Sequence, residues 1–455
     1  MSKQNVIAIF DVGKTNKKLF LFDEQYKIVF EKSVVLDEIN DEDGFPCENL
    51  ESLCAFINDA FLDVLGNPKF EIKAVNFSAY GASLVYLGEQ ERPIAPLYNY
   101  LKPYPEYLSK KFYSQYGGEE NFAYQTASPV LGNLNSGMQL YRIKYEQPDL
   151  FQRIKYAFHL PQFLSYLICG SRFSDLTSIG CHTNLWDFQR NTYHEWVSRE
   201  GLEEKLLPIE SSQTTISSTL QKYNFNAGIG LHDSSVALIP YLISFHDPFM
   251  LISTGTWCIS LNPFSTSPLT KEELENDCLC YLQYNGKPVK AARLLAGHVH
   301  DVEVLRIADH FQTDPRKYRQ IRFNEDAASR LQKINQPSIK NCAFAGRDMA
   351  GFTSDVEAYH QLISDIVAQQ SFSTALIIEN KKIERIFVDG GFSKNEIYMN
   401  LLGAAFPGME VYAASMAQAT ALGAALAIHN RWNKLSIPAD IITLETHLAK
   451  PNPML

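Results

Sequence analysis

The first candidate functional residues lie in two glycine turns, each between two apolar runs. The earlier turn lies between the apolar runs 6–10 and 19–22, an order that predicts a β-hairpin. Its amides and polar side chains could cradle phosphate oxygens, and the residues concerned are Gly13, Lys14, Thr15, Asn16 and Lys18. Asp11, at the end of the first run, could hold Mg²⁺ through water. The alternative interpretation is a solvated turn that Asp11 merely caps.

The later turn repeats this order about half a chain further on. Residues 248–257 lead into the apolar run 258–261, and aligning Gly255 with Gly13 places Ser253 opposite Asp11. This turn offers hydroxyl groups, including those of Thr254 and Thr256, but no charge. Two such hairpins in two similar halves could grip a polyphosphate from both sides, which a single hairpin could not do. Their joint occurrence therefore predicts a polyphosphate ligand.

An acidic residue, Asp233, stands between the glycine-rich loop 228–231 and residues that can start a helix. One interpretation is an N-cap, because a carboxylate there accepts hydrogen bonds from the first-turn amides. The other is a general base, an ionised carboxylate that takes the proton of a hydroxyl group during phosphoryl transfer. The position of Asp233 near the junction of the two halves favours the second interpretation.

The histidines and cysteines give weaker signals. His298 and His300 form an H-x-H pair that we interpret as structural, because positions two apart on a helix direct the two rings apart. His182 lies in a polar stretch and could contact a polyol or be a buried, hydrogen-bonded histidine. The close pair Cys278 and Cys280 has no second pair at zinc-site spacing, so the thiols are expected to be reduced. The chain has no G-x-S-x-G, H-E-x-x-H or G-x-G-x-x-G motif, which argues against the obvious hydrolase, zincin and dinucleotide-binding classes.

Predicted strands and helices alternate along the chain between these candidate residues. Strands are predicted at 71–78, 83–87 and 384–389, and helices at 160–168, 196–206, 395–406 and 413–429. A strand, the pair Gly390 and Gly391, and a helix form an α/β unit whose ligand crevice lies beyond the strand's carboxyl end. A repeat of about half the chain predicts two domains of one architecture, at 1–244 and 245–455.

Composition excludes several classes of protein. The 455 residues are 45% hydrophobic and 20% charged, which is typical of a globular protein rather than a disordered one. The net charge of -10 is opposite to that of a typical nucleic-acid-binding protein. We expect neither a secretory signal nor a membrane segment, since no apolar stretch reaches the ~20 residues that span a bilayer. These observations predict a cytoplasmic protein with no nucleic-acid or membrane partner.

In order along the chain, five motifs resemble those of the FGGY carbohydrate kinase family. They lie at residues 11–18, 231–237, 253–257, 388–395 and 419–425, so the resemblance covers almost the whole chain. The His232–Asp233 pair, the 253–257 turn and residues 160–166 are most similar to the rhamnulokinase and L-fuculokinase branch. The resemblance implies an α/β fold with two duplicated RNase H-like, actin-like ATPase domains and a cleft between them.

The resemblance also implies a role for each matching residue. Asp233 would be the catalytic base and Asp11 the carboxylate on the Mg²⁺ side. Phosphate would be bound by the first turn and by a second group, Thr254, Gly255 and Thr256. Adenosine would lie against Gly390, Gly391, Asn395 and Gln418. The sugar would lie against Ser78, Tyr80, Gly81, Tyr100 and His182.

The activity implied is ATP-dependent phosphorylation of a terminal hydroxyl of a ketose, with L-fuculose or L-rhamnulose as first candidates, by a monomer or homodimer. The alternatives are another ketose or polyol (xylulose, ribulose or glycerol), or an actin-like ATP-binding switch without kinase activity. The chain departs from the family at Lys14, at Lys18, and on the sugar side at Ser78 and at Tyr100-Leu101-Lys102, where the family has Tyr-Arg-Asp. The sugar-side departures leave the identity of the sugar open.

Overall fold

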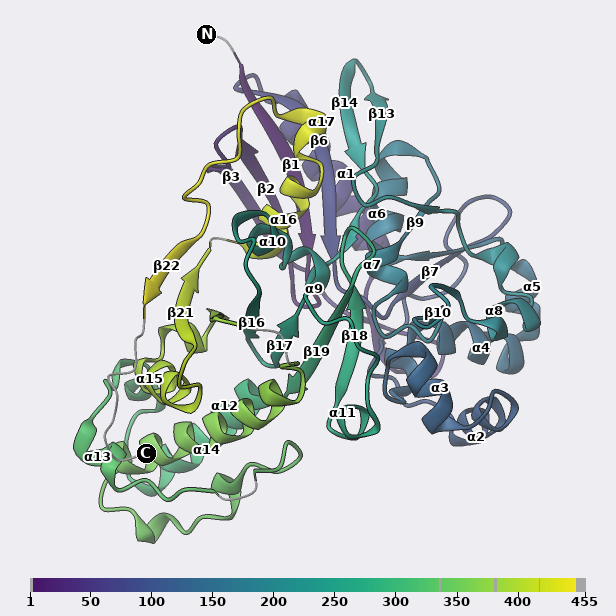
Figure 1. Cartoon of the computed structure of the whole chain (residues 1–455). Helices are drawn as coiled ribbons and strands as arrows, with labels where there is room; N and C mark the ends of the chain where they lie inside the picture. Colours follow the sequence, from purple (N-terminus) through teal and green to yellow (C-terminus); the bar gives the residue numbers. More distant parts are fainter. Residues whose placement is uncertain (1–2, 335–336, 380–382, 417, 447–455) are drawn as a thin grey trace. The chain divides into compact units, whose positions relative to one another are not determined.

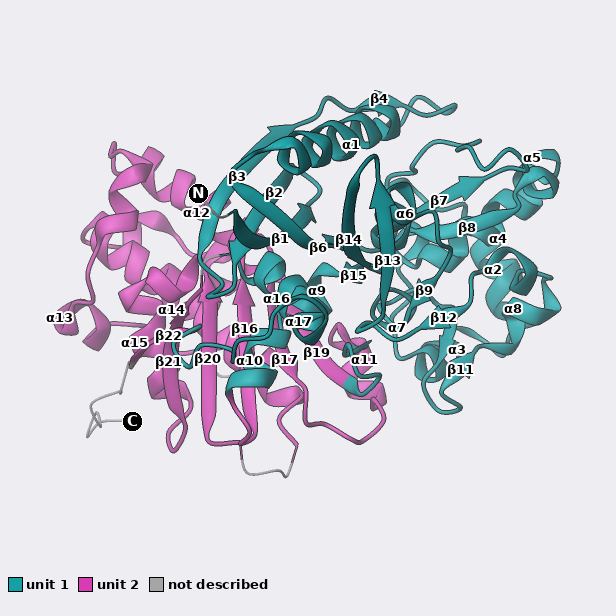
Figure 2. Cartoon of the chain, turned by 90° about the horizontal axis from the view of Figure 1, so that it is seen from above, with its two compact units in different colours: residues 1–244, 280–288, 417–441 teal, residues 245–279, 289–416, 442–455 magenta. Residues whose placement is uncertain are grey.

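The computed structural model describes residues 3–334, 337–379, 383–416 and 418–446 (Figure 1). The chain divides into two compact units (Figure 2). The first unit comprises residues 1–244, 280–288 and 417–441, and the second comprises residues 245–279, 289–416 and 442–455. The domains expected from the sequence are uninterrupted stretches, and their boundary at 244/245 stays a prediction. In the compact units, two later segments of the chain belong with its first 244 residues.

The main sheet of the first unit has the strand order β13-β14-β6-β1-β2-β3, and β15 also pairs with β6. Its strands are β1 (Gln4–Val12), β2 (Asn16–Asp23), β3 (Ile28–Val35), β6 (Phe70–Ala79), β13 (Thr215–Leu220), β14 (Tyr223–Gly228) and β15 (Leu231–His232). β1 is antiparallel to β2 and parallel to β6. The hairpin predicted over the first glycine turn is therefore confirmed, and so is the strand at 71–78.

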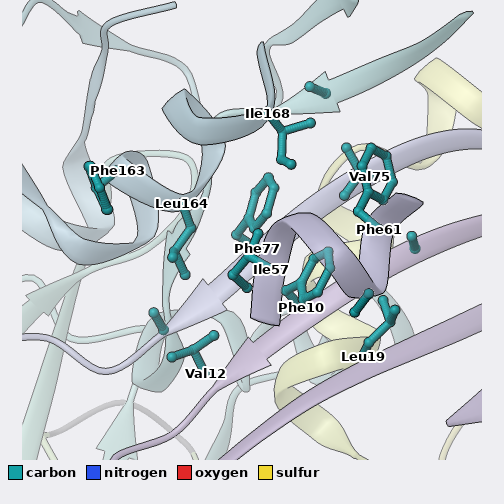
Figure 3. Close-up of a cluster of buried hydrophobic side chains, with 14 of the residues drawn as sticks. Phe10, Val12, Leu19, Ile57, Phe61, Val75, Phe77, Phe163, Leu164 and Ile168 are labelled. Atoms are coloured by element: carbon teal, nitrogen blue, oxygen red, sulfur yellow. The ribbon is translucent and has the colours of Figure 1, made fainter. Parts of the chain in front are cut away.

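One face of this sheet packs against two helices, α1 (Leu50–Gly66) and α6 (Leu160–Cys169). The side chain of Phe10 in β1 stacks on Phe77 in β6, with 5.7 Å between ring centroids, and meets Phe61 of α1 edge on (Figure 3). Because successive side chains of a strand point to opposite faces, residues of β1 in phase with Phe10 form this core.

The other face of the sheet packs against α16 (Ala419–Ala427), which contacts both β1 and β6. Ile7 and Ile9 are fully buried and alternate with the core positions of β1. Asp11 has the same phase along the strand, so it also points toward the α16 face. α16 consists of Ala, Leu, Gly and Thr residues, and these small side chains allow close packing.

The remainder of the first unit is mainly helical. Its longer helices are α2 (Glu106–Gln115), α3 (Glu119–Thr126), α4 (Ser136–Glu146) and α5 (Pro148–Arg153), with a two-stranded sheet of β7 (Leu84–Leu87) and β8 (Tyr156–His159). Phe112 is central to its aromatic core, since the rings of Tyr141 and Trp196 lie 4.9 and 5.1 Å from it. The predicted strand at 83–87 and helix at 160–168 are confirmed as β7 and α6.

The sheet of the second unit has the order β18-β19-β17-β16-β20-β21-β22. These strands are β16 (Phe249–Thr254), β17 (Cys258–Asn262), β18 (Cys278–Leu282), β19 (Pro288–Leu294), β20 (Arg385–Gly390), β21 (Glu410–Ser415) and β22 (Thr443–Thr446). β16 is antiparallel to β17 and parallel to β20, which repeats the relation of β1 to β2 and β6. The longest helices of this unit are α12 (Ala296–His310), α14 (Asp355–Leu376) and α15 (Glu396–Ala405).

Two helix predictions are wrong in part. The segment predicted as a helix over 196–206 divides into α8 (Glu195–Arg199) and a 3-10 turn at Glu203–Lys205, because Gly201 has a φ of +67°. The helix predicted over 413–429 begins only at residue 419, since residues 413–415 pair in β21 and Gln418 has a φ of 57°. Among the residues that the structure describes, no helix is both long and apolar enough to cross a bilayer.

Candidate active site

The first glycine turn joins β1 to β2. The amide of Gly13 donates to the carbonyl of Asn16 across it at 2.9 Å, and the strand register pairs Asp11 with Lys18. Thr15 and Asn16 are exposed, so their hydroxyl and amide groups are accessible for ligand contacts. Lys14 forms a partly exposed ion pair with Glu38 at 2.7 Å. The turn thus brings the five predicted phosphate-binding residues together.

Lys17 is a residue of this turn region that sequence reasoning missed. Its side chain is 1% exposed and forms an ion pair with Glu48, which is 3% exposed. Its position in β2 is the signal that could have revealed it. Lys17 is two residues before Leu19 and four before Leu21, so all three side chains point to the core face of the strand. A lysine at a core position requires a buried acceptor, since an unpaired buried charge is costly.

Asp11 lies where β1 meets α16. The hydroxyl of Thr420, in the first turn of α16, donates to Oδ2 of Asp11 at 2.7 Å. Burial raises the pKa of Asp11 to about 6; the hydrogen bond from Thr420 lowers it, and the charge of Asp233 raises it. Asp11 is therefore mostly ionised at neutral pH. Carboxylate and hydroxyl oxygens are the donors that Mg²⁺ prefers, so this pair of residues fits the predicted magnesium role.

Asp233 is the first residue of α9 (Asp233–Val236), directly after β15. The N-cap position belongs to His232, whose Nδ1 accepts from the amide of Ser234 at 3.2 Å. Oδ1 of Asp233 accepts from the same amide at 2.6 Å. The N-cap interpretation of Asp233 is therefore wrong as to position, although its carboxylate does bind a first-turn amide.

The surroundings of the Asp233 carboxylate suit it to proton transfer. Burial raises the pKa of Asp233 from its ordinary value of 3.8 to about 6, and the bonds to Ser234 lower it. The side chain nevertheless keeps 32% of its surface exposed, so a ligand can reach it. A carboxylate that is ionised at neutral pH but more basic than usual is an efficient proton acceptor.

Three of the predicted sugar-binding residues lie near these carboxylates. Ser78, near the end of β6, pairs in register with Asp11 on one side and with Leu231 of β15 on the other. The rings of Tyr80 and Tyr100 pack edge to face with centroids 6.2 Å apart. Burial raises the pKa of the Tyr100 hydroxyl, and the charge of Asp233 raises it further, which shows that the two groups are close.

The other two predicted sugar-binding residues surround His232. A Cβ added to Gly81 would lie 2.2 Å from Nε2 of His232, so this position admits only glycine while that ring stays in place. The ring of His182 lies 6.2 Å from that of His232, and Nδ1 of His182 is 3.0 Å from the carbonyl of Leu134. All five predicted sugar-side residues belong to the first unit, as does Asp233.

His182 and His232 also lie close to Cys181, and the potential ligand atoms of the three are within 4.8 Å of one another. They do not fit a metal site well. Nδ1 of His232 already accepts from the amide of Ser234, which leaves its Nε2 carrying the proton in the neutral ring. Burial lowers the pKa of His232 to about 4, so the ring is neutral at physiological pH.

The second glycine turn joins β16 to β17 and is fixed differently. The hydroxyl of Thr254 donates to the carbonyl of Asp389 at 2.5 Å and accepts from the amide of Phe392 at 3.0 Å. Thr254 is 5% exposed, so its hydroxyl belongs to the internal bonding of the unit. Gly255 and Thr256 are exposed. Those two residues, rather than the Thr254 side chain, are the accessible part of the predicted phosphate-binding group.

Of the four predicted adenosine-binding residues, Gly390 ends β20, and Gly391 and Asn395 follow it. Gly390 has a φ of +90°, and a Cβ there would lie 1.9 Å from the carbonyl oxygen of Thr254. Asn395 caps α15 by accepting from the amide of Tyr398, and its Nδ2 donates to the Tyr359 hydroxyl at 2.8 Å. Gln418, the fourth predicted residue, precedes α16 and belongs to the first unit.

His300 lies on α12 with Nε2 3.2 Å from the hydroxyl of Tyr359. Neither His298 nor His300 belongs to a group of three metal-ligating side chains within the described residues. The prediction that this H-x-H pair is structural stays a prediction.

Comparison with known families identifies the chain's class. Residues 6–239, more than half of the chain, match the N-terminal domain of the FGGY family of carbohydrate kinases. Residues 246–435 match the C-terminal domain of carbohydrate kinase FGGY. The chain therefore belongs to the FGGY family of carbohydrate kinases, and the resemblance and the fold class predicted from its motifs are confirmed.

Individual relatives are distant. A curated rhamnulokinase from Halalkalibacterium halodurans is 22% identical over 259 residues, and this match covers 54% of the chain but only about half, 52%, of the relative. The crystal structure of a carbohydrate kinase from Novosphingobium aromaticivorans is 20% identical, with a TM-score of 0.78 over 98% of this chain and 95% of that one. A gluconate kinase from Lactobacillus acidophilus is 15% identical, with a TM-score of 0.81 over 99% and 94%. At these identities the structural similarity shows the fold alone.

Proposed function

We propose that this chain is an ATP-dependent carbohydrate kinase that phosphorylates a terminal hydroxyl group of a ketose. The observation that carries the proposal is Asp233, an accessible carboxylate whose pKa is raised to about 6, close to Asp11 and Tyr100 in one compact unit. Membership of the FGGY family supports the reaction class. A general base, a phosphate-binding turn and a polar wall are what transfer to an alcohol requires.

In the proposed reaction, Asp233 takes the proton of the attacking hydroxyl. The oxygen of that hydroxyl forms a bond to the γ-phosphorus as the bond from phosphorus to the bridging oxygen of ADP breaks. The products are a sugar phosphate, ADP and a proton on Asp233. Asp11, oriented by Thr420, would hold Mg²⁺. When bound, Mg²⁺ would neutralise charge on the β- and γ-phosphates.

The phosphate and adenosine roles are part of the same proposal. Phosphate oxygens would be bound in the first unit by Gly13, Lys14, Thr15, Asn16 and Lys18. In the second unit they would be bound by Thr254, Gly255 and Thr256. The Thr254 contribution would come from its backbone, because its hydroxyl is bonded to Asp389 and Phe392. Adenosine would contact Gly390, Gly391, Asn395 and Gln418.

Within the ketoses, we propose a 6-deoxyketohexose, L-rhamnulose or L-fuculose, as the first candidate. The curated relative is named a rhamnulokinase, which supports this branch. The five predicted sugar-binding residues, Ser78, Tyr80, Gly81, Tyr100 and His182, are called the sugar wall. The departure at Leu101 and Lys102 directly follows Tyr100 and so changes this wall. Lys102 is 6% exposed and paired with Asp41 at 2.5 Å, while Leu101 is 68% exposed. Neither residue replaces the charged pair of the family, so this wall would favour a less polar sugar.

The substrate is tested by measuring ADP release with a panel of L-rhamnulose, L-fuculose, xylulose, ribulose and glycerol at equal concentrations. We expect the 6-deoxyketohexoses to give the highest kcat/KM. Release stimulated only by xylulose, ribulose or glycerol would keep the kinase and change its sugar. If no sugar raises ADP release while ATP still binds, the chain is an ATP-binding switch and the kinase proposal is wrong.

The role of Asp233 is tested with Asp233→Asn. We expect kcat to fall by about 10²–10⁴-fold, because general-base catalysis typically contributes that much. Binding of ATP, measured by calorimetry, should stay nearly unchanged. The matched control is Asp63→Asn, which neutralises an exposed carboxylate of the same unit that is paired with Lys32. Near-normal turnover of Asp233→Asn would remove Asp233 from the mechanism.

A further inference from the structure

A buried ion pair lies directly behind the first glycine turn. Nζ of Lys17 is 2.8 Å from Oε1 and 3.0 Å from Oε2 of Glu48. Lys17 belongs to β2, and Glu48 lies between β5 (Pro46–Cys47) and α1. The two side chains are only 1% and 3% exposed, so the pair is almost completely removed from solvent.

Each side chain of the pair also has a second hydrogen-bonding partner, one in the first glycine turn and one among the predicted sugar-binding residues. Nζ of Lys17 also donates to the backbone carbonyl of Lys14, inside the turn, at 2.9 Å. Oε2 of Glu48 also accepts from the hydroxyl of Tyr80 at 3.2 Å. A continuous path of hydrogen bonds therefore runs from the proposed phosphate-binding turn to the proposed sugar wall. All four residues belong to the first unit.

Stability alone does not explain such a pair. Removing two charges from water is unfavourable, and well-packed apolar residues in the same place are often as stable or more stable. A buried ion pair does supply fixed geometry, because each charge must keep its partners. Tyr80 is a dependable donor to Glu48, since burial raises the pKa of its hydroxyl far above its usual range.

We propose that Glu48 is a positioning residue that fixes the phosphate-binding turn through Lys17 and the sugar wall through Tyr80. This inference rests on the proposed kinase function. Glu48 itself would touch neither substrate. Its loss would loosen the two binding surfaces together, so that the affinities for ATP and for sugar change jointly.

The test is a set of KM and kcat measurements on the full chain, with calorimetric binding of ATP as a readout independent of turnover. For Glu48→Gln we expect the KM for ATP and the KM for sugar each to rise roughly 5–10-fold, the effect of losing about one ordinary hydrogen bond at each end. The Kd for ATP should rise by a similar factor. The effect on kcat should be smaller than that on either KM.

Tyr80→Phe tests only the contact between Glu48 and the sugar wall. It leaves the Lys17–Glu48 ion pair intact, so it can replace Glu48→Gln if that variant folds poorly. We expect the KM for sugar to rise roughly 5–10-fold while the KM for ATP changes less than about 2-fold. If Glu48 acts through Tyr80, the double variant should show the same KM for sugar as Glu48→Gln alone, because coupled residues are non-additive. Fully additive effects would mean that Glu48 does not act through Tyr80.

Glu273→Gln is the matched control for a purely structural effect. Glu273 forms a buried ion pair with Lys290 at 2.6 Å in the second unit, and neither residue has a proposed ligand role. We expect it to lower the melting temperature with both KM values unchanged. If Glu48→Gln behaves like this control, the positioning role is overturned while the kinase function stands. Absence of sugar-stimulated ADP release by the unmodified chain would instead overturn the proposed function.

Discussion

The two glycine hairpins have the same strand relations but are fixed by different groups. In each, the first strand is antiparallel to the next strand and parallel to a later one. The first turn is held by the buried Lys17–Glu48 ion pair, because Nζ of Lys17 also donates to the carbonyl of Lys14 in the turn. The second is fastened by the hydroxyl of Thr254 and by the close approach of Gly390. A duplicated fold therefore repeats its backbone, while the side chains that hold each turn are chosen locally.

The two turns also differ in the ionisable groups around them. Near the first turn lie two carboxylates whose pKa values are raised to about 6, those of Asp11 and Asp233. The second turn, residues 253–257, contains no ionisable side chain. The first turn should therefore respond most to loss of charge and to pH, and the second to changes of backbone space.

Lys17→Met should produce the largest loss of stability. It removes one partner of a buried ion pair and leaves the Glu48 charge uncompensated, which typically costs about 3–5 kcal/mol of unfolding free energy. Urea unfolding followed by circular dichroism measures the change. The matched control is Lys14→Met, which breaks an ion pair whose side chains are 25% and 46% exposed. That pair should contribute only about 0–1 kcal/mol.

The double variant Lys17→Met/Glu48→Gln sharpens this result. It neutralises both partners, so most of the lost unfolding free energy should return. If Lys17→Met and Lys14→Met cost the same, the first turn is not fastened by its buried charges, and the contrast between the two hairpins disappears.

Gly390→Ala should produce the next largest effect, in the second unit. Its φ of +90° is unfavourable for alanine, and the new Cβ would lie 1.9 Å from the backbone oxygen of Thr254. Strained backbone alone costs roughly 1–3 kcal/mol, before the clash is relieved. Gly391→Ala is the control, because Gly391 has a φ of -65° and nothing within 4 Å of an added Cβ.

Thermal unfolding of the two glycine variants measures this difference. We expect a clear fall in the melting temperature for Gly390→Ala and almost none for Gly391→Ala. Equal melting temperatures would show that the second turn is not fixed by backbone space.

The sequence patterns predict the backbone of both turns well. The apolar runs around Gly13 and Gly255 give the two hairpins, and the strand before Gly390 with the periodic segment after it gives β20 and α15. These signals are local, because each depends on residues of one element and of the next element along the chain. The prediction of a helix from 413 is wrong because alanine favours a helix locally, and pairing with β20 overrides this preference and places Ala413 in a strand.

The groups that fasten the first turn could not be predicted in the same way. Lys17 and Glu48 are 31 residues apart, and Thr420 and Asp11 are 409 apart, so the contacts arise only when the sheet and α16 assemble. The sequence shows only that Lys17 is in phase with core residues, not which acid it meets. The raised pKa values of Asp11 and Asp233 likewise follow from burial, which no spacing reveals.

The smallest expected effect is a pH-dependent gain of stability in Asp233→Asn. The folded-state pKa of Asp233, about 6, is above its ordinary value of 3.8, so the folded state binds the proton more tightly than the unfolded state. Between these two values the unfolding free energy contributed by Asp233 falls as pH rises, and above about pH 6 the full cost of its charge is present. Asparagine removes this cost. Because the side chain is partly exposed, we expect a gain on the order of 1 kcal/mol at pH 7.5 that vanishes near pH 3.5.

Thermal unfolding at several pH values measures this gain, and Thr256→Val in the second turn is the comparison. Thr256 is exposed and uncharged, so any change in its melting temperature should be the same at every pH. A gain in Asp233→Asn that is equally large at pH 3.5 would mean that lost charge is not its cause. A gain confined to neutral pH, in a variant that has lost turnover, would show that the first hairpin's unit carries a carboxylate kept for chemistry at the expense of stability.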